Sequence, residues 1–249
     1  MKDIKEYIYE GLLRGQKSTL DSGEEAIYAV LYTQVKEFLE ENYIGKWIIS
    51  EKPNKDGLYE VSSNESVRFI NMKITSLTND LFIWTSIKGD FGCSHCKELK
   101  SLKGAPKEVG GNFSCHHCNS LKTLEGAPEE VGNNFYCYYC NALKTLEGAP
   151  KIVKGSFDSS HCQSMESLKG APEEVGGVFS CSFCDSLKSL EGAPKYIRGS
   201  FNCYDCKSLE SLDGCPKTVG KNFAFYRNKI KISKLKIKMK CQIKGSIFC

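Results

Sequence analysis

The chain has 249 residues with a formal net charge of +4, and 41% of its residues are hydrophobic. This composition argues against a disordered chain and provides enough apolar material for one large domain or two small ones. The N-terminus lacks the apolar core of a signal peptide, and no segment reaches the roughly 18 apolar residues that would span a bilayer. We therefore expect a soluble cytoplasmic protein with reduced cysteines.

Residues 1–68 have the pattern of a small helical and hairpin cap. A first helical face is expected at Ile4, Ile8 and Leu12. A second helix is expected to start at Ser22, where Glu25 would complete a capping box. Its apolar face comprises Ile27, Val30, Leu31, Val35, Phe38 and Leu39. Residues 47–51 and 58–62 then form a predicted β-hairpin, and the apolar faces are expected to cover the open end of the segment that follows.

Residues 69–228 contain a tandem repeat of 22 residues. A phenylalanine recurs at this spacing without insertion or deletion, at Phe91, Phe113, Phe135, Phe157, Phe179, Phe201 and Phe223. A Gly-Ala-Pro sequence recurs in the same phase from 104–106 to 192–194, and Gly-Cys-Pro takes its place at 214–216. Residues 69–90 are interpreted as an atypical first coil, in which Phe69, Ile74, Leu77 and Ile87 keep the phase. Each such unit buries too little alone, so we expect a solenoid of stacked coils.

One coil illustrates how the repeat is expected to fold. The pattern matches a leucine-rich repeat in which Phe113 and Cys115 point inward from a strand and Cys118 takes the Asn/Cys position. Three further side chains are expected to fill the interior: Leu121, Leu124 and Val131. Gly-Ala-Pro then turns the chain away from the strand, because proline cannot donate to a strand ladder. The predicted fold class is α+β, with a small N-terminal cap, a leucine-rich-repeat-like β-solenoid and a C-terminal capping strand.

Five Cys-x-x-Cys pairs occur in phase with the repeat, at 93/96, 115/118, 137/140, 181/184 and 203/206. Such pairs often bind zinc, but the fourth coil has Ser159 at the first position and the seventh coil has Phe225 and Asn228. A zinc site could not accept phenylalanine, whereas a buried strand position can. We favour buried structural thiols, with zinc sites and disulfides as alternatives, and assign no role to Cys215, Cys241 or Cys249.

The positions one, three and four after each repeat phenylalanine are expected to point out of the strands and to vary from coil to coil. They hold all four histidines of the chain. Aromatic side chains on a rigid sheet are typical of interfaces, although they also stabilise exposed sheets as cross-strand pairs. A metal role for the histidines is the weaker alternative, because no third ligand recurs in phase. The predicted binding residues are His95, His116, His117, Tyr136, Tyr138, Tyr139, His161, Phe183, Tyr204 and Tyr226.

Residues 229–249 form a basic tail. Ten of the 34 basic residues and no acidic residue follow Asp213. Residues 235–243 alternate strictly between apolar and polar side chains, which predicts a capping strand with one lysine face. A nucleic-acid or polyanion contact and a disordered tail are the alternatives.

The repeat Phe-x-Cys-x-x-Cys-x-Ser-Leu-x-Ser-Leu-x-Gly-Ala-Pro-x-x-Val-Gly-Gly-Asn resembles leucine-rich-repeat-like proteins of bacteriophages and gut bacteria. Residues 1–8 and 10–16 are also similar to phage proteins, over a short stretch. The resemblance implies the solenoid architecture, a phage origin and a bacterial host cytoplasm.

No phosphate-binding loop, nucleophile elbow or His-Glu-x-x-His motif is present, and we expect neither catalysis nor a cofactor. The favoured function is a protein-binding module that acts on a host or virion partner through its strand face. Nucleic-acid binding through the basic tail and the aromatic positions is the alternative, followed by a zinc protein or an enzyme.

Overall fold

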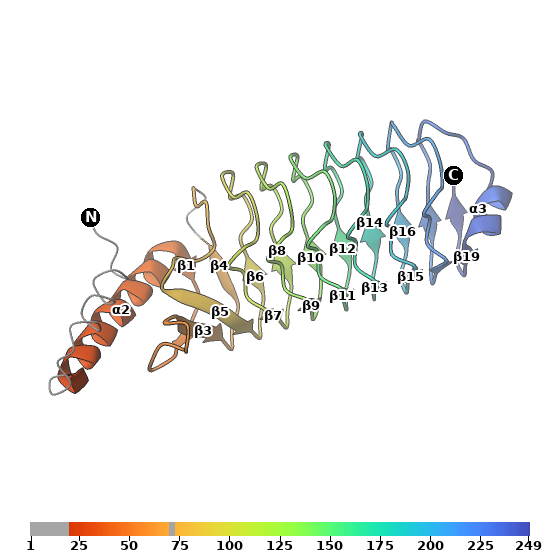
Figure 1. The fold of residues 1–249 in the computed structure, drawn as a ribbon. Helices are drawn as coiled ribbons and strands as arrows, with labels where there is room; N and C mark the ends of the chain where they lie inside the picture. Colours follow the sequence, from red (N-terminus) through yellow and green to blue (C-terminus); the bar gives the residue numbers. More distant parts are fainter. Residues whose placement is uncertain (1–19, 70–72) are drawn as a thin grey trace.

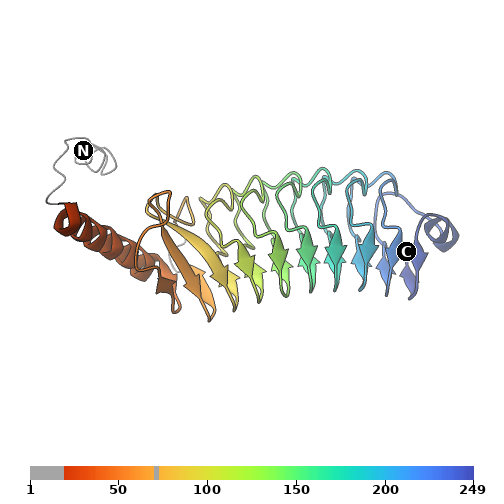
Figure 2. The same ribbon diagram turned by 60° about the horizontal axis from the view of Figure 1, so that its bottom comes forward.

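The computed structural model describes residues 20–69 and 73–249 and shows an elongated β-solenoid (Figures 1 and 2). Successive coils stack along one axis, with a helix at each end of the stack. The predicted helix at Ile4, Ile8 and Leu12 lies outside the described residues. No helix in the described part of the chain is long and apolar enough to cross a membrane.

Two ten-stranded sheets run the length of the solenoid. The first sheet contains β1 (Tyr43–Ile44), β4 (Val67–Phe69), β6 (Phe91–Gly92), β8 (Phe113–Ser114), β10 (Phe135–Tyr136), β12 (Phe157–Asp158), β14 (Phe179–Ser180), β16 (Phe201–Asn202), β18 (Phe223–Ala224) and β20 (Ile247–Phe248). The second contains β2 (Ile48–Ile49), β3 (Tyr59–Ser63), β5 (Phe82–Ile87), β7 (Glu108–Val109), β9 (Glu130–Val131), β11 (Ile152–Val153), β13 (Glu174–Val175), β15 (Tyr196–Ile197), β17 (Thr218–Val219) and β19 (Gln242–Ile243).

The repeat sets the register of both sheets. From β4 to β20 the strands of the first sheet are parallel, and each repeat phenylalanine is paired with the phenylalanine one coil away, as Phe113 is with Phe135. The second sheet pairs Val131 with Val153 in the same way. The repeat pattern predicted only the first of these strands in each coil. The second arises because Glu130 faces solvent while Val131 is buried, which is the two-residue alternation of a strand.

The interior is one continuous core in which equivalent side chains stack along the axis. Phe113 and Phe135 lie with ring centroids 5.1 Å apart and planes within 6°, and Phe135 and Phe157 repeat this at 5.2 Å and 3°. The predicted interior residues Leu121, Leu124 and Val131 are all fully buried. Each coil is thin, so stability comes from contact with the coils on either side.

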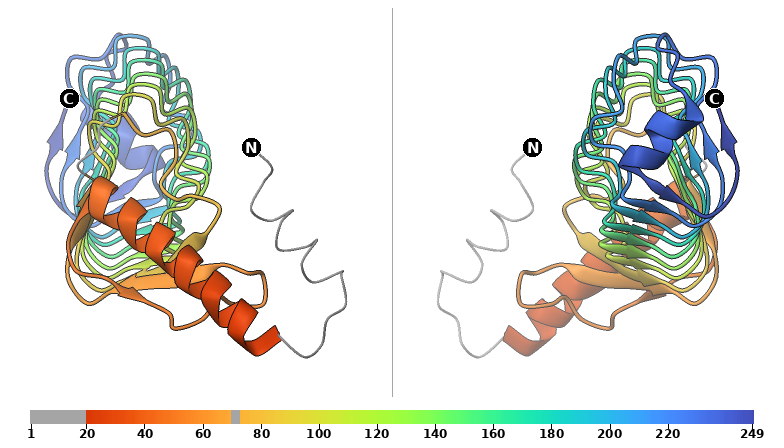
Figure 3. Two further views of the ribbon diagram at one scale, coloured as in Figure 1. Left: turned by 90° about the vertical axis from the view of Figure 1, so that its left-hand side faces the viewer. Right: turned by 90° about the vertical axis from the view of Figure 1, so that its right-hand side faces the viewer.

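The N-terminal cap is built onto the first coil and belongs to the same sheets. The predicted hairpin is confirmed, with β2 antiparallel to β3, and β3 continues in parallel onto β5. The residues that keep the repeat phase in the first coil are buried: Phe69, Ile74, Leu77 and Ile87. The helix α2 (Leu20–Asn42) crosses this end of the solenoid (Figure 3), and Phe38 of the helix packs against Phe82 at 5.7 Å.

Two details of α2 differ from the sequence prediction. The helix begins at Leu20, so Ser22 lies inside it and is not its N-cap. Sequence signals locate a helix boundary only to within a few residues. Leu31, Val35 and Leu39 are buried as expected, but Ile27 and Val30 are exposed.

The C-terminal prediction of a single strand over 235–243 is wrong. A short helix, α3 (Lys234–Lys240), occupies most of this segment, and only β19 at its end is a strand. Ser233 caps α3 by accepting a hydrogen bond from the Lys236 backbone N–H, which favours a helix start. The alternating apolar residues are therefore not on one face. Ile237 is buried, whereas Leu235 is 70% exposed.

The turn after each coil interior depends on a glycine with a positive φ. Gly148 has φ +87°, and a Cβ there would lie 2.3 Å from the backbone nitrogen of Glu125 in the preceding coil. The glycine therefore serves two purposes, a left-handed turn and the close approach of two coils. Gly57, at the tip of the β2–β3 hairpin, has φ +74° but open space around it.

We expect Gly148→Ala to lower the free energy of unfolding by at least about 2 kcal/mol more than Gly57→Ala. Both substitutions incur the cost of positive φ, but only the first forces a clash with the backbone of the preceding coil. Urea unfolding followed by circular dichroism measures the difference. Equal losses in the two variants would show that close coil contact at Gly148 does not limit stability.

Candidate functional site

The cysteine pairs lie inside the solenoid, where their thiols bond to the backbone. All ten cysteines of the five pairs and Cys162 are buried and free. From the second coil onward, the second cysteine of a pair donates to the carbonyl of the first-cysteine position one coil earlier. The Sγ–O distances are 3.2 Å for Cys118 to Cys93, 3.2 Å for Cys140 to Cys115, 3.3 Å for Cys162 to Cys137, 3.4 Å for Cys184 to Ser159 and 3.2 Å for Cys206 to Cys181.

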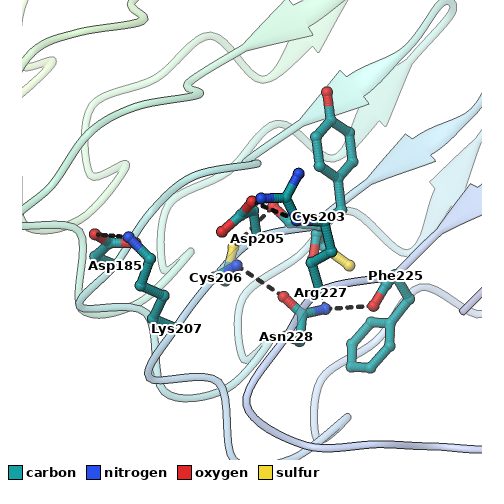
Figure 4. Close-up of polar contacts among 9 residues, drawn as sticks. Asp185, Cys203, Asp205, Cys206, Lys207, Phe225, Arg227 and Asn228 are labelled. Carbon is teal, nitrogen blue, oxygen red and sulfur yellow. Dashed lines mark hydrogen bonds and ion pairs between the residues drawn. The ribbon is translucent and has the colours of Figure 1, made fainter.

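Asn228 makes the equivalent contact in the last repeat coil. Its side-chain nitrogen donates to the Cys203 carbonyl at 2.9 Å and to the Phe225 carbonyl at 2.6 Å. Its side-chain oxygen accepts from the Cys206 backbone N–H at 2.8 Å (Figure 4). Thiol and amide therefore serve the same purpose at this position, which is to satisfy a buried carbonyl of the neighbouring coil. The cysteine ladder is a structural part of the core.

The chemistry of the first thiol of each pair follows from its burial. Desolvation raises the pKa of Cys93, Cys115, Cys137, Cys181 and Cys203 well above the ordinary thiol value. A buried thiol with a raised pKa is a poor nucleophile. Among the described residues, no three or more His, Cys, Asp or Glu side chains are grouped so that they could hold a metal ion.

We expect the folded, reduced protein to react rapidly with a thiol reagent such as Ellman's reagent at Cys249 alone. Cys249 is exposed, Cys215 is half-buried and the other twelve of the 14 cysteines are buried. Labelling at pH 8 followed by mass spectrometry of peptides identifies the modified positions. Denaturant should make all 14 cysteines reactive, and rapid native labelling of any paired cysteine would contradict this account.

The predicted binding residues lie at the ends of the strands of the first sheet. We call the residues three after each phenylalanine the strand-end row, and those four after it the turn row. The strand-end row consists of Ser94, His116, Tyr138, Ser160, Ser182, Tyr204 and Tyr226. The turn row consists of His95, His117, Tyr139, His161, Phe183, Asp205 and Arg227, and all seven have φ between 56° and 64°. The turn row is therefore in left-handed turns, and not in the strands as the sequence analysis assumed.

Five rings of the turn row form an unbroken stack. His95 and His117 are stacked at 4.7 Å, His117 and Tyr139 at 4.6 Å, Tyr139 and His161 at 4.3 Å, and His161 and Phe183 at 4.3 Å. The row then ends in an ion pair, in which Arg227 Nε lies 3.1 Å from Asp205 Oδ2 (Figure 4). Stacking offsets part of the cost of a left-handed backbone at residues other than glycine.

The strand-end row is interrupted in the middle. His116 and Tyr138 are stacked at 4.5 Å with planes within 5°, and Tyr204 and Tyr226 at 4.6 Å with planes within 7°. Between these two pairs the row holds only Ser160 and Ser182, whose side chains are buried. Two consecutive rings are thus missing from the row.

A cleft of about 520 Å³ lies over this interruption. Tyr138 and Tyr204 line its two ends, and Phe183 of the turn row lines one side. Asp158 lines the other side from β12, and its Oδ1 accepts from the Ser160 backbone N–H at 2.9 Å. Within the described part of the chain, Asp158 forms no ion pair.

The electrostatics of the cleft place the Asp158 charge near both tyrosines. Burial is the main factor that raises the pKa of Tyr138, followed by the Asp158 carboxylate. Burial also raises the pKa of Tyr204, with smaller contributions from Tyr226 and Asp158. A negative charge disfavours a second negative charge nearby, so both phenols stay protonated and can donate hydrogen bonds at neutral pH.

His116 is the most perturbed histidine of the face. Burial, and then the neighbouring His95 and His117, lower its pKa to about 4. Its Nδ1 is buried without a hydrogen-bond partner among the described residues. His116 is therefore neutral at physiological pH, and it stacks on Tyr138 as an uncharged ring.

We expect folded stability to fall as the pH is lowered from 6.5 towards 4, partly through His116. The unfolded chain has the ordinary histidine pKa near 6.5, so it binds more protons than the folded chain in this window. Stability is fully present above pH 6.5 and is lost as pH falls through the folded pKa. His116→Tyr keeps the stack and removes the titration. Urea unfolding at pH 7.5 and 5.0 should show a loss about 1 kcal/mol smaller in this variant; equal losses would rule out His116 as the cause.

All ten residues that the sequence analysis selected lie on this one face, in the two rows and at Tyr136 of β10. The structure adds three residues to the candidate site: Asp158, which lines the cleft, and Ser160 and Ser182, which lie between the two stacked ring pairs. Comparison with known proteins finds no family model, no curated protein and no solved structure that matches the chain.

Proposed function

We propose that this protein is a non-catalytic binding module that recognises a partner protein through the two aromatic rows. The observation that carries the proposal is the five-ring stack of the turn row at left-handed backbone positions. Such positions favour glycine or asparagine and cost about 1–2 kcal/mol for other residues. Large rings nevertheless occupy these positions and are partly exposed at the strand ends of a rigid sheet, which is a reason to assign them to an interface.

The composition and rigidity of this face support protein recognition. Tyr139 and Tyr226 are each 38% exposed, so the rows present ring edges and polar tips to solvent. Tyrosine and histidine provide amphipathic contact area at a small cost in side-chain entropy. The proposal includes the leucine-rich-repeat-like character of the solenoid, a phage origin, and a partner from the host cytoplasm or the virion.

We expect a triple variant His116→Ser, Tyr136→Ser, Tyr138→Ser to lose partner capture. Serine already occupies equivalent positions at Ser94, Ser114 and Ser160, so the solenoid accepts it there. The experiment compares the proteins captured from a bacterial lysate by the wild-type and variant chains at equal concentration, identified by mass spectrometry. Partners should fall at least tenfold with the variant.

A matched control removes exposed side chains from the second sheet. Ile152 and Tyr196 are 37% and 55% exposed on β11 and β15, and Ile152→Ser with Tyr196→Ser should leave capture unchanged. Thermal unfolding of both variants checks that they remain folded. The same proteins captured by the triple variant and the wild type would exclude the aromatic rows as the site.

A second candidate function, polyanion binding, is favoured by the C-terminal end. Two of its lysines are paired, Lys229 with Glu210 and Lys240 with Asp213, both at 2.8 Å. Three lysines of α3 form no ion pair within the described chain and are exposed: Lys234, Lys236 and Lys238. Phosphate binding by these residues would weaken steeply with salt.

Titration with a double-stranded oligonucleotide at 50 and 200 mM NaCl tests this candidate. If it is correct, the dissociation constant rises at least tenfold between the two salt concentrations, and Lys234→Gln with Lys238→Gln weakens binding further. An affinity that does not depend on salt, or no binding at 50 mM, excludes it.

A further inference from the structure

The cleft between Tyr138 and Tyr204 has the shape of two missing members of a ring stack. Tyr138 stacks on His116 through one face, and Tyr204 stacks on Tyr226 through one face. The coils next to their other faces contribute only Ser160 and Ser182 to the row. Because neighbouring strands lie about 4.8 Å apart, three coil steps leave about 14 Å between the two ring planes. A planar group can enter edge-on and stack on either tyrosine.

The negative charge of Asp158 favours a planar group that is positively charged. Asp158 lines the cleft and forms no ion pair with another described residue. Its Oδ1 accepts one hydrogen bond, from the backbone N–H of Ser160, which leaves carboxylate lone pairs available. Two tyrosine faces and a carboxylate form a set of groups that attracts a cation through ring quadrupoles and direct charge.

The same face already holds a carboxylate–guanidinium pair made from the chain itself. Asp205 and Arg227 occupy the last two positions of the turn row, where earlier coils have rings, and their atoms are 3.1 Å apart. Asp205 is buried and forms an ion pair with Arg227, whereas Asp158 forms no ion pair with another described residue. This pair shows that a carboxylate and a guanidinium at adjacent coils of this face lie close enough to form an ion pair.

We propose that the cleft between Tyr138 and Tyr204 binds an arginine side chain of the partner protein, with the guanidinium stacked on a tyrosine ring and bonded to Asp158. This inference rests on the proposed protein-binding function and names the chemistry that the partner must present. A lysine ammonium would gain the charge interaction but cannot stack as a plane. A sugar would use the ring faces but has no positive charge to pair with Asp158.

The test uses the full chain and the tripeptide Ac-Gly-Arg-Gly-amide, with Ac-Gly-citrulline-Gly-amide as the neutral counterpart of the same shape. Binding is followed by NMR of the chain labelled with carbon-13 at its tyrosine rings. We expect millimolar binding of the arginine peptide with shifts at Tyr138 or Tyr204, and binding of the citrulline peptide at least fivefold weaker. Neutral cellohexaose is a third ligand, which should not bind.

Two variants test the cleft, each with a matched control. Ser160→Tyr adds a ring to the interrupted row and should abolish binding, whereas Ser94→Tyr adds one at the start of the same row and should change the affinity less than twofold. Asp158→Asn should weaken arginine binding at least fivefold. Asp185→Asn removes a carboxylate of the following coil that is paired with Lys207, and should have no effect. If Ser160→Tyr does not fold, Ser182→Tyr replaces it and Asp158→Asn still decides.

Several results would overturn this inference. They are the absence of arginine binding to the wild type at 50 mM peptide, equal binding of the citrulline peptide, and unchanged binding by Ser160→Tyr. Binding of cellohexaose in place of the arginine peptide would assign the cleft to a sugar. Partner capture that is lost in the triple serine variant but intact in Asp158→Asn and Ser160→Tyr would leave the binding function standing and remove only the arginine site.

Discussion

Backbone hydrogen bonds between successive coils set the spacing on which every other contact in this protein depends. Each runs to the residue just before the equivalent one in the next coil, as from Cys93 N–H to the Ser114 carbonyl at 2.8 Å and from Cys115 N–H to the Tyr136 carbonyl at 2.8 Å. A repeat of constant length keeps this pairing in register over the whole solenoid. An insertion of one residue in any coil would move every later side chain out of register with its neighbour.

Because equivalent positions meet at every step, each position in the coil forms a ladder with its own chemistry. The phenylalanine ladder fills the core, and each thiol of the cysteine ladder donates a hydrogen bond to a buried backbone carbonyl of the preceding coil, as Cys118 does to Cys93. Substitution within a ladder is tolerated where the new group performs the same task, as the Asn228 amide does for a thiol. A cysteine pattern that resembles a metal motif therefore arises from the repeat of one buried hydrogen bond.

The sequence predicted the coil phase and the interior because both depend on spacing alone. Phe113, Cys115 and Val131 are buried as their period predicts. The second sheet was missed because each of its repeat strands has one buried residue, such as Val131 beside Glu130, whereas Phe113 and Cys115 of the first sheet show a period of two. The C-terminal strand was wrong because alternation over 235–243 competes with a helix start at Ser233, and a local cap outweighed the pattern there.

The candidate binding face was predictable as a set of positions, but its arrangement was not. The repeat spacing predicted that the ten aromatic and histidine residues share one face. Nothing in the sequence indicated that the turn row adopts a left-handed backbone or that its rings stack. Asp158 became a candidate site residue only when the structure placed it in the lining of the cleft. The same residue type at Asp205 is neutralised by Arg227 of the next coil, and the difference lies in three-dimensional context.

The interruption of the strand-end row is a feature that a role in stability alone does not explain. A ladder selected for stability alone would continue its rings, since each stacked aromatic pair contributes about 0.5–1.5 kcal/mol beyond its buried area. Here Tyr138 and Tyr204 are each stacked on one side and left open towards Ser160 and Ser182. Adding a partner ring or guanidinium would complete the row from outside. The solenoid thus has at its centre an open position in its own stacking pattern, and the proposed arginine side chain would fill it.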